Sequence, residues 1–179
     1  FSLETTEGVQ IVDICAVCHQ LITLISAQYS APQYKFECEL EKVEVMGNPG
    51  PLKQALMNVM INAAQAIADR GFIKLTVLDS PTLVTIKILD SGCGIPTKHL
   101  KRVFEPFFTT KPEGQGQGLG LSVAYTAIEQ HQGKISISSK EAKGTVVEIT
   151  IPKQPAAQPP SSEDNEENKE NEAENSQTA

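Results

Sequence analysis

The chain has 179 residues, 40% hydrophobic and 5% aromatic, and its 15 Lys and Arg against 22 Asp and Glu give a formal net charge of −7. The length suits one domain, the acidic balance argues against a nucleic-acid-binding protein, and four cysteines do not make a disulfide scaffold. No run of eighteen apolar residues is present, so we expect no membrane-spanning segment. Because the chain starts at Phe1 and shows no signal peptide, we interpret it as a piece of a longer protein.

Apolar periodicity predicts three helices and five strands in mixed order. The expected helices cover residues 9–29, 52–69 and 119–130. The expected strands cover residues 34–41, 72–78, 83–89, 134–139 and 145–151. Residues 90–118 are rich in Gly and Pro and have little regular pattern. This order predicts an α+β fold, a two-layer α/β sandwich with a mixed five-stranded sheet and helices on one face.

The negative charge is concentrated at the C-terminal end. Residues 154–179 hold seven acidic residues and one basic residue, which leaves residues 1–153 with a net charge of −1. This end has no aromatic residue and no Val, Ile, Leu or Met, so it cannot bury enough surface to offset the entropy of ordering. We therefore predict a folded domain over residues 1–152 and a disordered acidic tail over residues 153–179.

Two amides stand out on the second predicted helix. Asn58 and Asn62 are four residues apart and share one helix face. They are either solvent-facing amides or oxygen donors for a divalent cation. Mg²⁺ takes such hard oxygen ligands and keeps water and nucleotide phosphates in its shell.

The segment from Asp90 to Gly94 follows a predicted strand directly. Gly92 and Gly94 allow a sharp turn and a close approach of the backbone to a flat ligand. A carboxylate at the end of a strand can accept a hydrogen bond from an exocyclic amine, such as that of adenine. Without other evidence this segment is also compatible with an ordinary turn.

Two further segments lead up to the third predicted helix. Three of the six phenylalanines fall within residues 104–108, as a buried plug or as the anchor of a mobile lid. Residues 114–121 are glycine-rich and lead into the helix, where free N–H groups and the helix dipole favour phosphate. No Gly-Lys-Ser/Thr follows, so this is not a Walker A loop. The glycines do not follow the first strand of a βαβ unit, which excludes a Rossmann site.

In their order, residues 58–66, 90–94, 104–111 and 116–121 resemble the N, G1, F and G2 boxes of sensor histidine kinases. The catalytic ATP-binding domain of that family has the Bergerat (GHKL) fold, shared with DNA gyrase, Hsp90 and MutL. The resemblance extends over residues 1 to about 152. In detail it is similar to the nitrogen-regulation and oxygen-sensing branch. It implies a protein-histidine kinase that uses ATP and Mg²⁺.

The resemblance also implies roles for individual residues. Asn62 would ligate Mg²⁺, Asn58 would lie beside it near the phosphates, and Asp90 would accept from the adenine amine. Residues 105–117 would form a mobile lid. The other nucleotide-binding positions would be Gly92, Gly94, Ile95, Phe104, Thr110, Gly116, Gly118, Leu119, Gly120 and Leu121.

Two positions depart from relatives of the resembled family. Gyrase-like ATPases have a Glu as general base where this chain has Asn58, so we expect slow hydrolysis. Many histidine kinases carry Lys or Arg where this chain has Gln65. Phosphoryl transfer depends on charge stabilisation, so another cation is needed. Lys111 is the first candidate and Arg102 the second.

None of His19, His99 and His131 is followed by the acidic residue and Asn-Pro of a phosphoacceptor. The resemblance implies that the acceptor is a His on dimerisation helices of the parent protein, that the parent is a homodimer, and that a response regulator acts downstream. We expect a cytoplasmic domain, whether or not its parent is attached to a membrane. The alternatives are a gyrase- or Hsp90-like ATPase module, a module that binds a partner without nucleotide, and a serine-type kinase.

The residues Cys15-Ala-Val-Cys18-His19 match the spacing of a haem c attachment site. Both cysteines lie on the apolar stripe of the first predicted helix, where free Cys behaves as a small hydrophobe. A zinc site would need ligands beyond His19. We interpret the cluster as core packing.

Overall fold

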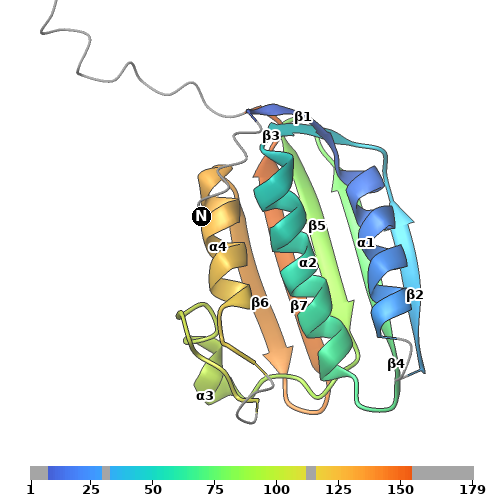
Figure 1. The fold of residues 1–179 in the computed structure, drawn as a ribbon, viewed down its shortest axis with the longest axis vertical. Coiled ribbons are helices and arrows are strands. Elements are labelled where there is room, and N and C mark those ends of the chain that lie inside the picture. Colours follow the sequence, from blue (N-terminus) through green and yellow to red (C-terminus); the bar gives the residue numbers. More distant parts are fainter. Residues whose placement is uncertain (1–7, 30–32, 112–115, 155–179) are drawn as a thin grey trace, which may run out of the picture.

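The computed structural model describes residues 8–29, 33–111 and 116–154 (Figure 1). The helices are α1 (Ile14–Gln28), α2 (Pro49–Ala66), α3 (Thr97–Leu100) and α4 (Gly120–Gln130). The strands are β1 (Gln10–Asp13), β2 (Gln33–Leu40), β3 (Glu44–Gly47), β4 (Arg70–Asp79), β5 (Leu83–Asp90), β6 (Lys134–Lys140) and β7 (Gly144–Pro152). The predicted tail beyond residue 154 and lid residues 112–115 lie outside the described residues. Within the described part, no helix has the length and apolarity to cross a bilayer.

Five strands form one sheet in the order β2-β4-β5-β7-β6. The pair β2–β4 is parallel and the other three pairs are antiparallel. Helices α1, α2 and α4 lie along one face of the sheet (Figure 1). The predicted two-layer α+β fold with a mixed five-stranded sheet is therefore confirmed.

The inward face of β5 carries the main polar group of the core. Val84, Ile86 and Ile88 are buried, and because side chains alternate along a strand, Asp90 points to the same face. The strand thus delivers one carboxylate to the space between the sheet and the helices. Its own apolar side chains hold that position.

Helix α2 lies in the middle of the helical layer (Figure 1). Asn48 caps it by accepting from the N–H of Gly50 at 3.2 Å, and Pro49 opens the helix without losing a hydrogen bond. The N–H of Asn48 also donates to Nε2 of His131 at 2.9 Å, and the other ring nitrogen of His131 lies 2.7 Å from the carbonyl oxygen of Ala127. These contacts join the start of α2 to the end of α4.

The prediction of a helix from residue 9 is wrong. Residues 10–13 form β1, which pairs antiparallel with β3, a strand that periodicity did not reveal. The helix starts only at Ile14, because the side chain of Asp13 accepts from the N–H of Ala16 at 2.9 Å as an N-cap. Ile11, expected on the apolar stripe of the helix, is consequently 66% exposed.

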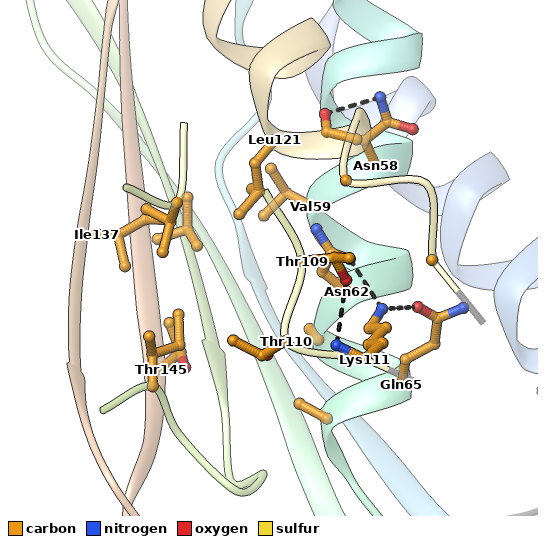
Figure 2. Close-up of a pocket in the computed structure, with 18 of the residues that line it drawn as sticks. Asn58, Val59, Asn62, Gln65, Thr109, Thr110, Lys111, Leu121, Ile137 and Thr145 are labelled. Atoms are coloured by element: carbon orange, nitrogen blue, oxygen red, sulfur yellow. Dashed lines mark hydrogen bonds between the residues drawn. The ribbon is translucent and has the colours of Figure 1, made fainter. Parts of the chain in front are cut away.

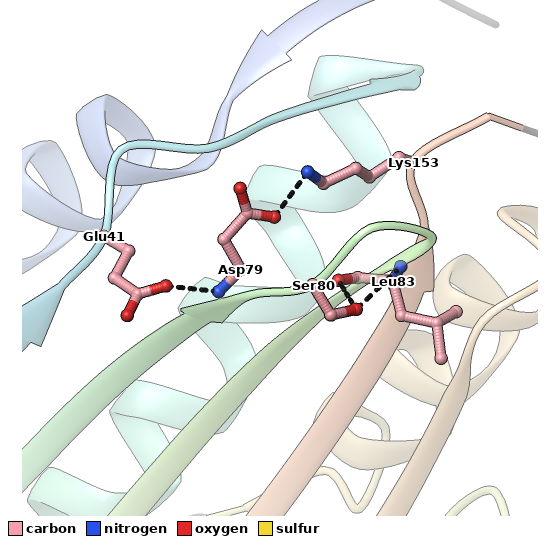
Figure 3. A network of polar contacts seen from close by, with 5 residues as sticks. All are labelled: Glu41, Asp79, Ser80, Leu83 and Lys153. Carbon is pink, nitrogen blue, oxygen red and sulfur yellow. Dashed lines mark hydrogen bonds and ion pairs between the residues drawn. The ribbon is translucent and has the colours of Figure 1, made fainter.

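A polar network stabilises the turn between β4 and β5 (Figure 3). The hydroxyl of Ser80 donates to the carbonyl of Leu83 at 2.7 Å and accepts from its N–H at 3.1 Å. The N–H of Asp79 donates to the carboxylate of Glu41 at 2.6 Å, and the carboxylate of Asp79 pairs with Lys153 at 2.5 Å. The network fixes the sheet register where the chain leaves β7.

Candidate nucleotide-binding site

A cavity of about 730 Å³ lies between α2, α4, the end of β5 and the segment that precedes α4 (Figure 2). Twelve of the fifteen residues predicted from the sequence line it, and they come from separate parts of the chain. They are Asn58, Asn62, Asp90, Gly94, Ile95, Thr110, Lys111, Gly116, Gly118, Leu119, Gly120 and Leu121. Gly92, Arg102 and Phe104 do not line it.

Asp90 is the acidic group of the cavity. It is 4% exposed, and the only other buried polar residue in the described ranges is its register partner Thr145. The carboxylate accepts from the N–H of Gly92 at 2.8 Å and from the backbone N–H of Thr145. Burial raises the pKa of Asp90, and these two N–H groups oppose the shift only in part.

The walls around this carboxylate are apolar. They are formed by Val59, Ala63, Ile88, Ile137 and Val147. An apolar slot with one acceptor is suited to a flat ring that carries an amine.

Backbone groups of the turn after Asp90 form hydrogen bonds with α2, with β6 and with the turn between β6 and β7. The N–H of Cys93 donates to the carbonyl of Ala66 at 2.9 Å, and the carbonyl of Cys93 accepts from Ala142 at 2.7 Å. The N–H of Ile95 donates to the hydroxyl of Ser139 at 2.8 Å. The turn is therefore built before any ligand arrives, which lowers the entropy cost of binding.

The two glycines of this turn serve different purposes. A Cβ on Gly92 would lie 2.6 Å from the Cβ of Ala66, so this glycine permits close packing on the end of α2 rather than lining the cavity. Gly94 lines the cavity and has a φ of +70°, a left-handed conformation that favours glycine.

The opposite side of the cavity is lined by amides of α2 (Figure 2). The ammonium of Lys111 donates to Oδ1 of Asn62 at 3.4 Å and to Oε1 of Gln65. Burial lowers the pKa of Lys111. Asn58 donates from Nδ2 to the carbonyl of Gly120 at 3.1 Å, so its side chain joins α2 to the start of α4.

The glycine-rich segment closes back on the Phe-rich segment. Gly118 has a φ of +67°, and a Cβ there would lie 2.4 Å from the carbonyl carbon of Phe107, which itself has a φ of 66°. The start of α4 has no side-chain cap, so its first N–H groups are available to a ligand. At Gly120 a Cβ would meet Asn58 and Asn62 only at an ordinary contact distance of 3.8 Å, so crowding does not require a glycine there.

The remaining predicted residues lie outside the cavity. Arg102 pairs with Glu105 at 2.9 Å and lies 4.5 Å above the ring of Phe108. Phe104 packs on the core and contacts Tyr125, with ring centroids 5.3 Å apart. Arg102 is thus held by a neighbouring carboxylate, whereas Lys111 faces the cavity.

The cysteine cluster lies on α1, on the side of α2 that faces away from α4 (Figure 1). Cys18 is fully buried, and burial raises its pKa to about 12, while Cys15 is half-buried. In the ranges that the structure describes, no three His, Cys, Asp or Glu side chains are close enough together to hold a metal ion.

Sequence reasoning missed Ser139 and did not assign Thr145 a contact. The hydroxyl of Ser139 donates to the carbonyl of Gly144 at 2.8 Å and lies 2.9 Å from the hydroxyl of Thr145. Strand alternation in β6 and β7 is enough to place Ser139 and Thr145 on the inward face of the sheet. Only the sheet register shows that these two residues meet the turn after Asp90.

Comparisons with known proteins agree with this geometry. The profile of a family described as histidine kinase-, DNA gyrase B-, and HSP90-like ATPase matches residues 47–155. Sensor histidine kinase ZraS of Escherichia coli strain K12 is 36% identical over 147 residues, which are 81% of this chain and 31% of ZraS. Sporulation kinase E of Bacillus subtilis strain 168 is 37% identical over 143 residues, or 78% and 19% of the two chains. The chain spans less than a third of the length of these curated relatives.

Solved structures of histidine kinases show the same fold over most of this chain and over nearly all of their own length. The catalytic domain of histidine kinase ThkA superposes with a TM-score of 0.72 and 32% identity, over 83% of this chain and 97% of that chain. A mycobacterial sensor histidine kinase, MprB, superposes with a TM-score of 0.74 and 27% identity, over 83% and 100%. The chain therefore belongs to the family of histidine kinase-, DNA gyrase B- and HSP90-like ATPases, on the branch of the sensor histidine kinase catalytic domains.

Proposed function

We propose that this domain binds ATP with Mg²⁺ and transfers the γ-phosphoryl group to a histidine on the dimerisation helices of its parent protein. The observation that carries the proposal is one cavity surrounded by Asn62, Asp90 and Gly118. The parent would be a homodimer and would pass the phosphoryl group to a response regulator.

The cavity has its negative and positive groups at different places, as the adenine and the triphosphate of a nucleotide require. Among the described residues that line it, Asp90 is the only carboxylate and Lys111 the only Lys or Arg. Thr145, the neighbour of Asp90, lies across the pocket from Lys111 (Figure 2). An adenine amine would donate to Asp90, while the triphosphate would lie near Lys111 and the first N–H groups of α4.

The residues present also fit a magnesium ion. Asn62 turns an uncharged amide oxygen into the cavity, and Mg²⁺ would use the lone pair that the long hydrogen bond from Lys111, at 3.4 Å, leaves open. That oxygen is a hard ligand of the kind that Mg²⁺ takes together with phosphate oxygens. Asn62 would hold the ion, whose chemistry is the neutralisation of phosphate charge.

The geometry favours transfer to a protein over direct hydrolysis. Asn58 occupies the position where a gyrase-like ATPase needs a general base, and an amide cannot accept a proton at neutral pH. Both ends of this amide are engaged, because Oδ1 accepts from Gln54 at 3.0 Å and Nδ2 donates to Gly120. Water activation by Asn58 is therefore not supported.

Titration with a fluorescent ATP analogue, with and without Mg²⁺, tests binding. Transfer is tested by adding the parent's acceptor helices and labelled ATP, then treating the product with acid and alkali. We expect Mg²⁺-dependent binding, slow hydrolysis and an acid-labile, alkali-stable phosphoprotein. Failure to bind would leave a partner-binding module, rapid hydrolysis would indicate an ATPase, and an acid-stable product would indicate a serine-type kinase.

A further inference from the structure

Gln65 is an exposed residue of α2 whose side-chain amide is nevertheless engaged at both ends. Its Oε1 accepts a hydrogen bond from the ammonium of Lys111, and its Nε2 donates to the hydroxyl of Tyr29 at 3.3 Å. Tyr29 is the C-cap of α1, where its N–H donates to the carbonyl of Ile25 at 2.8 Å. Because an ammonium only donates, Lys111 fixes Oε1 of Gln65 on its own side, which leaves Nε2 to donate to Tyr29.

The ammonium of Lys111 lies between two amide oxygens of the same helix (Figure 2). One is Oε1 of Gln65 and the other is Oδ1 of Asn62, at 3.4 Å. The two acceptors are three residues apart on α2 and hence on one face. Gln65 therefore keeps the positive charge within reach of the proposed Mg²⁺ ligand, although Lys111 belongs to a different segment of the chain.

We propose that Gln65 is a positioning residue for phosphoryl transfer, which holds the Lys111 ammonium beside Asn62 so that a lid residue supplies the positive charge at the triphosphate. The inference rests on the proposed function and deepens it. It also makes the two positions interdependent. A neutral acceptor at position 65 matches a Lys at position 111, whereas two cations at this distance repel each other.

A purely structural role for Gln65 would have different consequences. If its bond to Tyr29 only joined α1 to α2, replacing Gln65 would lower stability by the same amount whatever residue stood at position 111. If Gln65 acts through Lys111, its replacement changes transfer only while Lys111 is present. A double-mutant cycle separates these cases.

The experiment compares the full chain with Gln65→Lys, Lys111→Met and the double variant. Lys111→Met removes the charge and nearly preserves the length of the side chain. The measurements are the affinity for a fluorescent ATP analogue with Mg²⁺, and kcat and KM for ATP in transfer to added acceptor helices. Each single variant should lower kcat/KM by about tenfold, the size of coupling between contacting residues. In the double variant, the ammonium introduced at position 65 replaces the missing cation and should restore kcat/KM to within about threefold of the original.

Two controls make the cycle specific. Gln130→Lys makes the same change at an exposed position at the end of α4, and its kcat/KM should equal that of the original chain. Gln65→Met removes both hydrogen bonds without adding charge, and it should lower kcat/KM in the original chain but not in Lys111→Met. Thermal unfolding of every variant measures the structural contribution separately.

The outcomes distinguish the inference from the function on which it rests. If the original chain binds and transfers while the effects of Gln65→Lys and Lys111→Met simply multiply, the positioning role is wrong and the kinase proposal stands. If Gln65→Met lowers kcat/KM equally in both backgrounds, Gln65 acts through the fold. If the original chain does not bind the nucleotide, both proposals are overturned.

Discussion

Asp90→Asn tests the recognition of adenine most directly. The carboxylate lies buried in an apolar slot, where a hydrogen bond from an amine to a charged acceptor contributes about 1.5–3 kcal/mol. Loss of the charge should therefore weaken ATP binding by about 10- to 150-fold. The stability of the fold should change much less than the affinity for ATP. An Asn keeps an acceptor for the N–H of Gly92 and can lose the bond from Thr145, which costs about 1 kcal/mol, while the cost of burying a charge disappears.

The assay is competition of ATP and inosine triphosphate against a fluorescent analogue, with thermal unfolding measured in parallel. Inosine triphosphate has a carbonyl where ATP has the amine, so it cannot donate to Asp90. The original chain should prefer ATP, and Asp90→Asn should abolish most of that preference. Equal affinities in the original chain would refute the contact, and a loss of stability as large as the loss of affinity would make Asp90 a structural residue.

The pH dependence follows from the same group. Burial raises the pKa of Asp90 above its unfolded value, so the folded domain holds that proton more tightly. Its ionisation therefore destabilises the fold at neutral pH, and this cost is relieved as the pH falls through the raised pKa. ATP affinity should fall over the same range, because the charged acceptor is lost. In Asp90→Asn, neither stability nor ATP affinity should change over this pH range. If the variant keeps the pH dependence of the original chain, another group is responsible for it.

Three further changes test the rest of the site. Asn62→Ala removes the amide oxygen next to Lys111 and should abolish Mg²⁺-dependent nucleotide binding or transfer; transfer at the original rate would exclude Asn62 as a ligand. Gly118→Ala places a Cβ 2.4 Å from the backbone of Phe107 at a φ of +67°, a strain of about 1–3 kcal/mol that should lower nucleotide affinity, and an unchanged titration would show that this contact is not needed. Removal of residues 154–179 should leave ATP affinity unchanged; a large shift would contradict the predicted separation of domain and tail.

Local patterns were sufficient for the elements that follow a single period. Apolar periodicity predicted a strand over residues 83–89, which is β5 without its last residue, and a helix that carries Asn58 and Asn62 on one face. The order of the four short segments also predicted the family, because each segment is contiguous in sequence. Each element or segment is recognised from residues within about two helical turns of one another, and only the order of the segments uses the longer chain.

Contacts between distant residues could be decided only by the tertiary structure. The antiparallel pair β1–β3 overrode the helical pattern of residues 10–13, because a partner some thirty residues away offered hydrogen bonds that periodicity does not reveal. Asn58 shows the same limit within the site. Its helix face was predictable, but its bond to Gly120 spans 62 positions.

The choice of the cation that faces the cavity separates what the sequence determines from what the tertiary structure determines. From the sequence, Lys111 was the first candidate and Arg102 the second, since Gln65 stands where many histidine kinases carry a cation. The fold pairs Arg102 with Glu105 and brings Lys111 against α2, 46 residues away from its partner Gln65. Residue types and short spacings determine what chemistry is available, whereas the packing of Lys111 against α2 decides which charge is brought to the cavity.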